Sequence, residues 1–252
     1  MKEEIRRQIL QALPEIEKMD EIEVVEQRNK EYGDFSSNVA LKMAKKLGKT
    51  PMELAKCLAE SIKTEGTFAE VEAVPPGFIN FYIGEEWLYK AFEAWHFESL
   101  PLEVRKDIRC IVKAEEAGGC IQGILRAEEI KRLQYVHSRS KSIIRILKAE
   151  GICYDDLKTG FDYHRTDVEK EILRQLMDYH RMIQMTFEKR DCKILLEYML
   201  TLGAGFYRYH EGILFRSLKS PLLYGTLRVM DGIRLVMKDL LDILGLDAPE
   251  KS

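Results

Sequence analysis

Residues 131–148 read KRLQYVHSRSKSIIRILK and carry the clearest periodic signal in the chain. Placed on a helical wheel, one set of their side chains falls within a single arc of about 100°. This set comprises Leu133, Val136, Ser140, Ile143, Ile144 and Leu147. The pattern predicts an amphipathic helix that buries this arc in a helical core.

The same wheel places Tyr135 well outside the buried arc, with Lys131, Arg132 and Arg139 beside it. An exposed tyrosine among cations can stack on an unpaired RNA base while the cations contact phosphates. The alternative is that Tyr135 packs against a neighbouring helix and the cations face water. Periodicity alone leaves both interpretations open.

Helical patterns continue from about Arg126 to the end of the chain. Long apolar stripes at helical spacing run over residues 127–149, 167–188, 191–216 and 222–244. The C-terminal half is therefore predicted to be an all-α bundle.

The N-terminal part alternates between strand and helix signals and is predicted to be a small α+β domain. Two strands, 71–74 and 78–83, flank a Pro-Pro-Gly turn. Ser36 and Ser37 are candidate N-caps for a helix that runs through Leu47. Further helices are expected over residues 3–13 and 85–95. Another helix is expected to begin at Pro51, with Thr50 as its N-cap, and a short strand is expected over residues 22–26.

The fold class is thus α+β, with an α+β domain at residues 1–95 and a helical domain at 126–252. A short connector, 96–125, lies between them. Ile108–Val112 is a candidate strand in this connector, and the glycines of Gly118–Gly123 indicate a loop rather than a phosphate cradle.

Composition argues against several functional classes. The 252 residues are 46% hydrophobic and carry a net charge of −3. The charge is unevenly distributed, because residues 1–95 have a net charge of −5 and residues 131–252 have a net charge of +4. The five cysteines form no C-x-x-C pair, the five histidines have no metal-ligand spacing, and no nucleophile elbow or Walker loop occurs. The sequence predicts no catalytic residue, no metal, no cofactor and no membrane segment, and a cytoplasmic location.

Two stretches of the N-terminal part resemble a known family. Residues 31–51 read EYGDFSSNVALKMAKKLGKTP, and residues 76–81 read PGFINF. They are similar to the G-D-[FY]-x-[ST]-N run and the P-G-F-I-N-F strand of the N-terminal additional domain of arginyl-tRNA synthetases.

The helical part resembles the same family. Residues 134–139, QYVHSR, are similar to the Q-Y-A-H-A-R signature that opens its DALR-type anticodon-binding domain. Tyr198–Phe206 and the closing LGLDAPE of residues 244–250 are similar to two later patterns in that domain. Where the family usually has R-L-x-L, residues 226–229 read TLRV, which puts recognition of an arginine anticodon in doubt.

The resemblance implies that the family's catalytic domain is missing. That domain spans several hundred residues and holds ATP with H-x-G-H and K-M-S-K-type motifs. Here about thirty residues occupy its place, too few for a nucleotide-binding sheet with crossover helices. The expected protein is therefore not an enzyme.

The resemblance also implies two groups of RNA-contacting residues. Phe78 and Asn80, with Tyr82 next on the same strand face, match positions that read a base at the corner of the tRNA. An exposed Asn80 is expected, because a buried amide without partners is costly. In the helical domain, Tyr135, His137 and Arg139 match positions that grip the anticodon arm, beside Lys131 and Arg132.

The leading hypothesis is a non-catalytic tRNA-binding protein, with arginine tRNAs as candidates, that acts as an adaptor, a chaperone or a regulator. Its partners would be tRNA and, for an adaptor, a tRNA-modifying enzyme or a synthetase. The alternative is a protein-interaction module that no longer binds RNA, which the acidic N-terminal part favours. A third reading, new chemistry in residues 96–125, has no motif in its support. The sequence does not indicate an oligomeric state.

Overall fold

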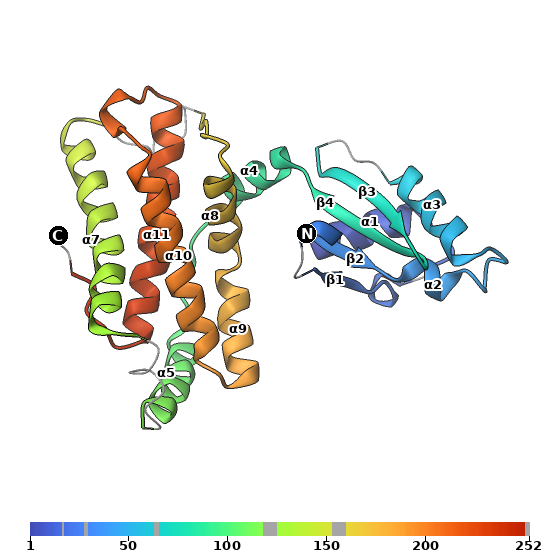
Figure 1. Cartoon of the computed structure of the whole chain (residues 1–252), viewed down its shortest axis with the longest axis horizontal. Coiled ribbons are helices and arrows are strands. Elements are labelled where there is room, and N and C mark those ends of the chain that lie inside the picture. Colours follow the sequence, from blue (N-terminus) through green and yellow to red (C-terminus); the bar gives the residue numbers. More distant parts are fainter. Residues whose placement is uncertain (17, 28–29, 63–65, 118–124, 153–159, 250–252) are drawn as a thin grey trace. The chain divides into compact units, whose positions relative to one another are not determined.

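The structure is a computed structural model that describes residues 1–252 except 17, 28–29, 63–65, 118–124, 153–159 and 250–252 (Figure 1). The chain divides into two compact units, Met1–Glu93 and Ala94–Ser252. The glycine-rich segment 118–123 lies outside the described residues.

The N-terminal unit is a four-stranded antiparallel sheet in the order β1-β2-β4-β3 with helices packed on it. Its elements are α1 (Lys2–Ala12), η1 (Met19–Glu21), β1 (Val24–Glu26), η2 (Lys30–Tyr32), β2 (Phe35–Ser37), α2 (Val39–Met43), α3 (Pro51–Ser61), β3 (Phe68–Val74), β4 (Phe78–Ile83) and α4 (Glu85–Ala94), which crosses the unit boundary. The predicted α+β fold is confirmed.

Local sequence explains how α3 begins. The Thr50 hydroxyl accepts a hydrogen bond from the Glu53 backbone N–H (3.3 Å), and the Glu53 carboxylate accepts one from the Thr50 N–H (3.0 Å). This capping box satisfies two donors that the first helical turn leaves free, with Pro51 at the first helical position. The predicted N-cap is confirmed.

The prediction that Ser36 and Ser37 cap a helix is wrong. Both lie in β2, where Ser36 pairs with Asn80 and Ser37 with Ile79 of β4, and α2 begins only at Val39. Both serines are buried, and the Ser37 hydroxyl donates to the Glu23 carbonyl oxygen (2.7 Å). The Ser37 hydroxyl also accepts a hydrogen bond from the Val39 N–H at the start of α2 (3.3 Å), but Asn38 occupies the N-cap position, because Ser36 and Ser37 are paired within the sheet.

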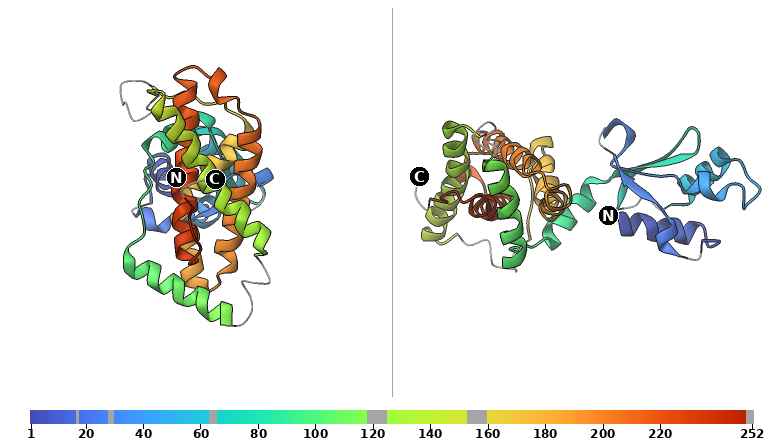
Figure 2. Two further views of the ribbon diagram at one scale, coloured as in Figure 1. Left: turned by 90° about the vertical axis from the view of Figure 1, so that its left-hand side faces the viewer. Right: turned by 90° about the horizontal axis from the view of Figure 1, so that it is seen from below.

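The C-terminal unit is a helical bundle, as predicted. Its elements are α5 (Leu102–Ala117), α7 (Ala127–Ala149), α8 (Asp167–Met177), α9 (Tyr179–Lys189), α10 (Lys193–Glu211), η3 (Phe215–Ser217) and α11 (Leu222–Ile243). Helices α7, α10 and α11 pack side by side, and α8 and α9 pack against α10 (Figures 1 and 2).

Two details of this unit differ from the prediction. The expected strand Ile108–Val112 is part of helix α5. The expected helix 167–188 is two helices, α8 and α9, with Asp178 between them.

Across the parts of the chain that the structure describes, no helix is long and apolar enough to cross a membrane.

Candidate RNA-binding surface

The predicted Tyr135 lies on α7 and stacks on a second tyrosine, Tyr207, from α10. The two ring centroids are 6.1 Å apart with an interplanar angle of 8°. Tyr135 is nevertheless 38% exposed, so part of its side chain is open to solvent. The ring therefore packs on a neighbouring helix, as one of the two interpretations expects, while stacking on an RNA base stays a prediction.

Gly203 of α10 lies close to α7 in this region. A Cβ atom on Gly203 would lie 2.8 Å from Cδ2 of Leu133, a buried residue of α7. Real Cβ contacts are essentially never that short, so the Leu133 side chain would have to shift to accommodate a larger residue at position 203.

Arg132 contacts Tyr207, the second tyrosine of the pair. Its guanidinium carbon lies 5.0 Å from the centroid of the Tyr207 ring, within the range of a cation–π contact. The Tyr207 hydroxyl donates a hydrogen bond to the Arg132 backbone carbonyl (3.1 Å). Burial raises the pKa of the Tyr207 phenol, which keeps this donor protonated at neutral pH.

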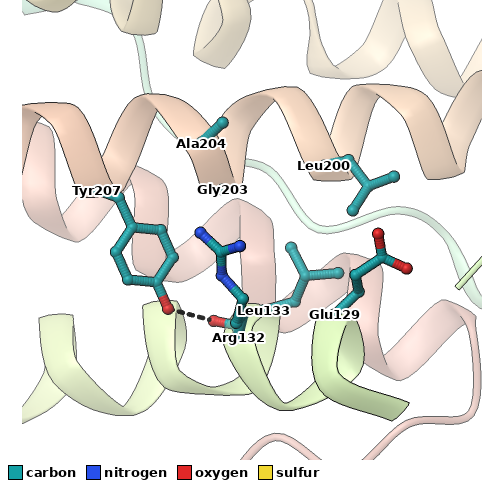
Figure 3. A pocket seen from close by; sticks show the side chains of 7 residues that line it. All are labelled: Glu129, Arg132, Leu133, Leu200, Gly203, Ala204 and Tyr207. Atoms are coloured by element: carbon teal, nitrogen blue, oxygen red, sulfur yellow. Dashed lines mark hydrogen bonds between the residues drawn. The ribbon is translucent and has the colours of Figure 1, made fainter. Parts of the chain in front are cut away.

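Arg132 and Tyr207 line a pocket of about 270 Å³ between the two helices (Figure 3). The other lining residues are Glu129, Leu133, Leu200, Gly203 and Ala204. The pocket is an open recess beside the stack rather than an enclosed cavity, and Arg132 extends across it toward Tyr207 (Figure 3).

Arg139 lies about two turns beyond Arg132 along α7 and pairs with His210 of α10. The Arg139 Nε–H donates to Nε2 of His210 (3.2 Å), so this imidazole nitrogen acts as an acceptor. The His210 ring also stacks on Phe206 (5.3 Å, 20°) and lies 6.0 Å from the Phe215 ring. We call the set Lys131, Arg132, Tyr135, Arg139, Tyr207 and His210 the aromatic–cation cluster.

The pKa of His210 is lowered, first by burial and then by the Arg139 charge, with Glu211 opposing. The pKa of His137 is also lowered, first by burial. In the unfolded chain both imidazoles regain a pKa near 6.5, so below that pH the unfolded state binds more protons than the folded state. Their contribution to stability is complete above about pH 6.5 and is lost as the pH falls below it.

We expect the melting temperature to fall as the pH is lowered through about 6.5, and His210→Gln to reduce that dependence. The glutamine amide oxygen can still accept from Arg139 but does not titrate. Thermal melts of both proteins between about pH 8 and pH 5 measure the effect. An identical pH dependence in the two proteins would contradict the assignment to His210.

Two predicted contacts prove to be buried, and this corrects the sequence analysis. His137 is only 2% exposed, because it faces α11, where its Nδ1 lies 3.3 Å from the Arg234 carbonyl oxygen. Asn80 is 3% exposed, because β4 is a central strand and its neighbours Ser36 and Glu72 flank it on both sides. Direct contact between either side chain and RNA does not fit these positions.

The other predicted residues of β4 reach the surface. Phe78 is 36% exposed, and Tyr82 is partly exposed. The Tyr82 hydroxyl donates to the Glu31 carbonyl oxygen (3.1 Å) and lies 3.4 Å from a Glu72 carboxylate oxygen. Burial and the nearby Glu72 and Glu70 raise the pKa of Tyr82. This face of the sheet therefore offers two aromatic rings, and the Tyr82 ring lies beside carboxylates.

Tyr207 and His210 complete the cluster from α10 and were not among the residues predicted from the sequence. A signal was available, because Tyr207 lies off the buried stripe of that helix, which includes Leu202 and Phe206. What the sequence could not provide was their pairing with α7, about seventy residues away along the chain.

The described residues contain no group of three or more His, Cys, Asp or Glu side chains that could hold a metal ion.

Two domain families match the sequence. The family described as "Arginyl tRNA synthetase N terminal domain" matches residues 2–83, and the family described as "DALR anticodon binding domain" matches residues 133–251. The chain thus carries an arginyl-tRNA synthetase N-terminal domain followed by a DALR anticodon binding domain. The matches leave residues 84–132 between them unassigned, so neither covers a catalytic domain, and the aromatic–cation cluster lies mostly within the DALR match.

Individual relatives show the same partial overlap. The arginine–tRNA ligase of Caldanaerobacter subterraneus is 36% identical over 104 residues, 38% of this chain and 18% of the relative. That of Acetivibrio thermocellus is 28% identical over 120 residues, 47% of this chain and 21% of the relative. The arginyl-tRNA synthetase of Thermus thermophilus has a TM-score of 0.40 and 25% identity over 48% of this chain and 20% of its own. This chain thus spans about a fifth of the length of these proteins.

Proposed function

We propose that this chain is a tRNA-binding protein that does not aminoacylate its tRNA, and that the aromatic–cation cluster contacts the anticodon arm. The exposure of Tyr135 beside the Tyr207 ring is the observation that carries the proposal. It offers an unpaired base a stacking surface already held flat by Tyr207 and flanked by Lys131 and Arg132, which are both exposed.

The N-terminal domain supplies a second contact in this proposal. Phe78 is the exposed aromatic ring on the outer face of the sheet, and it follows the turn at Gly77. A partly exposed phenylalanine can stack on an unpaired base of a loop. Because Asn80 is buried, we assign it to shaping this face rather than to reading the base edge, and His137 to holding α7 against α11.

Fluorescence anisotropy with labelled tRNA, at low and high salt, tests the proposal. We expect binding that weakens steeply as salt increases, because cations that contact phosphates release counterions. Arginine tRNAs are the first candidates, and an adaptor would also recruit a tRNA-modifying enzyme or a synthetase. An anisotropy that does not change at low salt would refute the proposal.

The absence of aminoacylation is tested separately. Residues 84–132, the only span between the two family matches, contain no H-x-G-H motif. We expect no arginine- and tRNA-dependent pyrophosphate exchange, and measurable turnover would overturn this part of the proposal.

A protein-interaction module is the second candidate function. It is favoured by the net charge of −5 on residues 1–95 and by the exposed Glu70 and Glu72 on the sheet face that carries Tyr82. The same anisotropy titration separates the two functions, because a module that has lost RNA binding gives no signal at any salt concentration.

A further inference from the structure

The segment that follows the N-terminal unit is built into the helical bundle, although it lies outside both family matches. Residue Ala94 begins the second compact unit, whereas the DALR match begins at residue 133. Helix α5, which lies in this segment, packs against α9 and α11. Its apolar side chains Ile108, Ile111 and Val112 are all buried.

The stretch before α5 is anchored as well. The Arg228 guanidinium of α11 donates to the Trp95 carbonyl oxygen (3.1 Å), and the Trp95 ring lies against Gly232 of the same helix. The Phe97 ring lies 5.5 Å from the Tyr179 ring at the start of α9. The segment is thus held from its first residues onward rather than only through α5.

A buried ion pair joins this segment to the bundle. Asp239 of α11 is 4% exposed and forms an ion pair with Arg105 of α5, while the Tyr179 hydroxyl donates to its other carboxylate oxygen. Burial raises the pKa of Tyr179, which keeps the phenol a donor. A buried carboxylate that loses its cation is strongly destabilising. Removing α5 would therefore leave Asp239 without its cation and would destabilise the bundle.

Arg109 makes a further contact one turn along the same helix. Its guanidinium donates to the Asp242 backbone carbonyl (2.6 Å) in the last turn of α11. The same carbonyl accepts from the Gly245 N–H (3.2 Å) just beyond the helix, and a cation near the C-terminus of a helix is favourable. Two arginines spaced four residues apart on one helix therefore meet two acceptors spaced three apart on another.

We propose that residues 94–117 are an intramolecular strap, and that the α9–α11 face is an interaction surface for an amphipathic helix that delivers one guanidinium to Asp239. The chain supplies this helix itself. With this strap included, the folded helical domain begins at Ala94 rather than at residue 133. This inference does not depend on RNA binding.

Hydrogen exchange on the full chain tests the strap. With Arg105→Met, which removes the cation but retains an apolar stem, we expect amides of α5 to exchange at least about tenfold faster than in the wild type. Lys106→Met is the matched control, because Lys106 is exposed on the same helix and its loss should leave exchange unchanged. Equal exchange in these two variants would overturn the proposal, as would wild-type α5 amides that exchange like those of an unstructured peptide.

A double variant covers the case in which Arg105→Met fails to fold. Arg105→Met with Asp239→Asn leaves no unpaired buried charge, so we expect it to recover a large part of the lost protection or yield. A double variant that is no better than Arg105→Met would show that the arginine does not serve Asp239.

Discussion

Arg132→Ala combined with Tyr135→Ala is expected to weaken tRNA binding by roughly 10- to 100-fold. A stacked base contributes about 1–3 kcal/mol, and Arg132 adds a cation that can contact a phosphate. Both side chains are exposed, so the fold should be retained. Anisotropy titrations at several salt concentrations give the affinity, and loss of one phosphate contact should reduce the salt slope by about one.

Tyr135→Phe is the matched control for this experiment. Stacking requires the ring and not the hydroxyl, so this variant should bind tRNA nearly as well as the wild type. If Tyr135→Phe were as weak as the double variant, or if the double variant bound normally, the cluster would not be the contact surface.

Gly225→Ala is expected to produce the largest loss of stability of any single methyl addition in the C-terminal unit. A Cβ atom at this position of α11 would overlap the carbonyl oxygen of Asp162, and Tyr163 lies close beside it. The Asp162 segment cannot easily withdraw, because its N–H donates to the Pro221 carbonyl (3.3 Å). We expect a net loss of about 3 kcal/mol, even though alanine is intrinsically the better helix former by about 1 kcal/mol.

Thermal or urea unfolding measures this loss, which corresponds to a melting temperature lower by about 10 °C. Gly212→Ala is the control, because Gly212 has a φ of −82° and its added methyl would meet only backbone atoms at 3.8 Å or more. That variant should be neutral or slightly stabilised. If both alanine variants melted together, the close approach of the Asp162 segment would be wrong.

Regular periodicity made the helical bundle predictable. The stripe of residues 131–148 gave a helix predicted over 127–149, and α7 spans Ala127–Ala149. The last helix, predicted over 222–244, spans Leu222–Ile243. In both cases a long apolar face leaves little choice, because it must be buried against other helices.

Short signals failed where a wider window was needed. Ile108, Ile111 and Val112 suggest a strand when taken alone, but with Val104 they follow the helical spacing i, i+4, i+7 and i+8. A five-residue apolar run cannot distinguish the two structures. The buried partners of α5, Asp239 and Tyr179, lie far away in the sequence and left no local trace.

Only the α7 part of the candidate site was predicted from the sequence. The wheel identified Tyr135 and its cations because these depend on one helix, whereas Tyr207 and His210 come from a second helix whose packing is not encoded locally. The burial of Asn80 was also beyond reach, because alternation assigns a side chain to a sheet face but does not say whether neighbouring strands cover it.

The carboxylates of Glu70 and Glu72 have a consequence for how copies of this chain meet. Strand β3 lies at the end of the β1-β2-β4-β3 order, so one side of it is not paired with another strand of the sheet. An exposed strand edge can recruit a strand from another molecule and start aggregation, and like charges side by side oppose such recruitment. Glu70 and Glu72, which lie beside Tyr82, therefore oppose edge-to-edge pairing of β3 with a strand of another copy in concentrated solution.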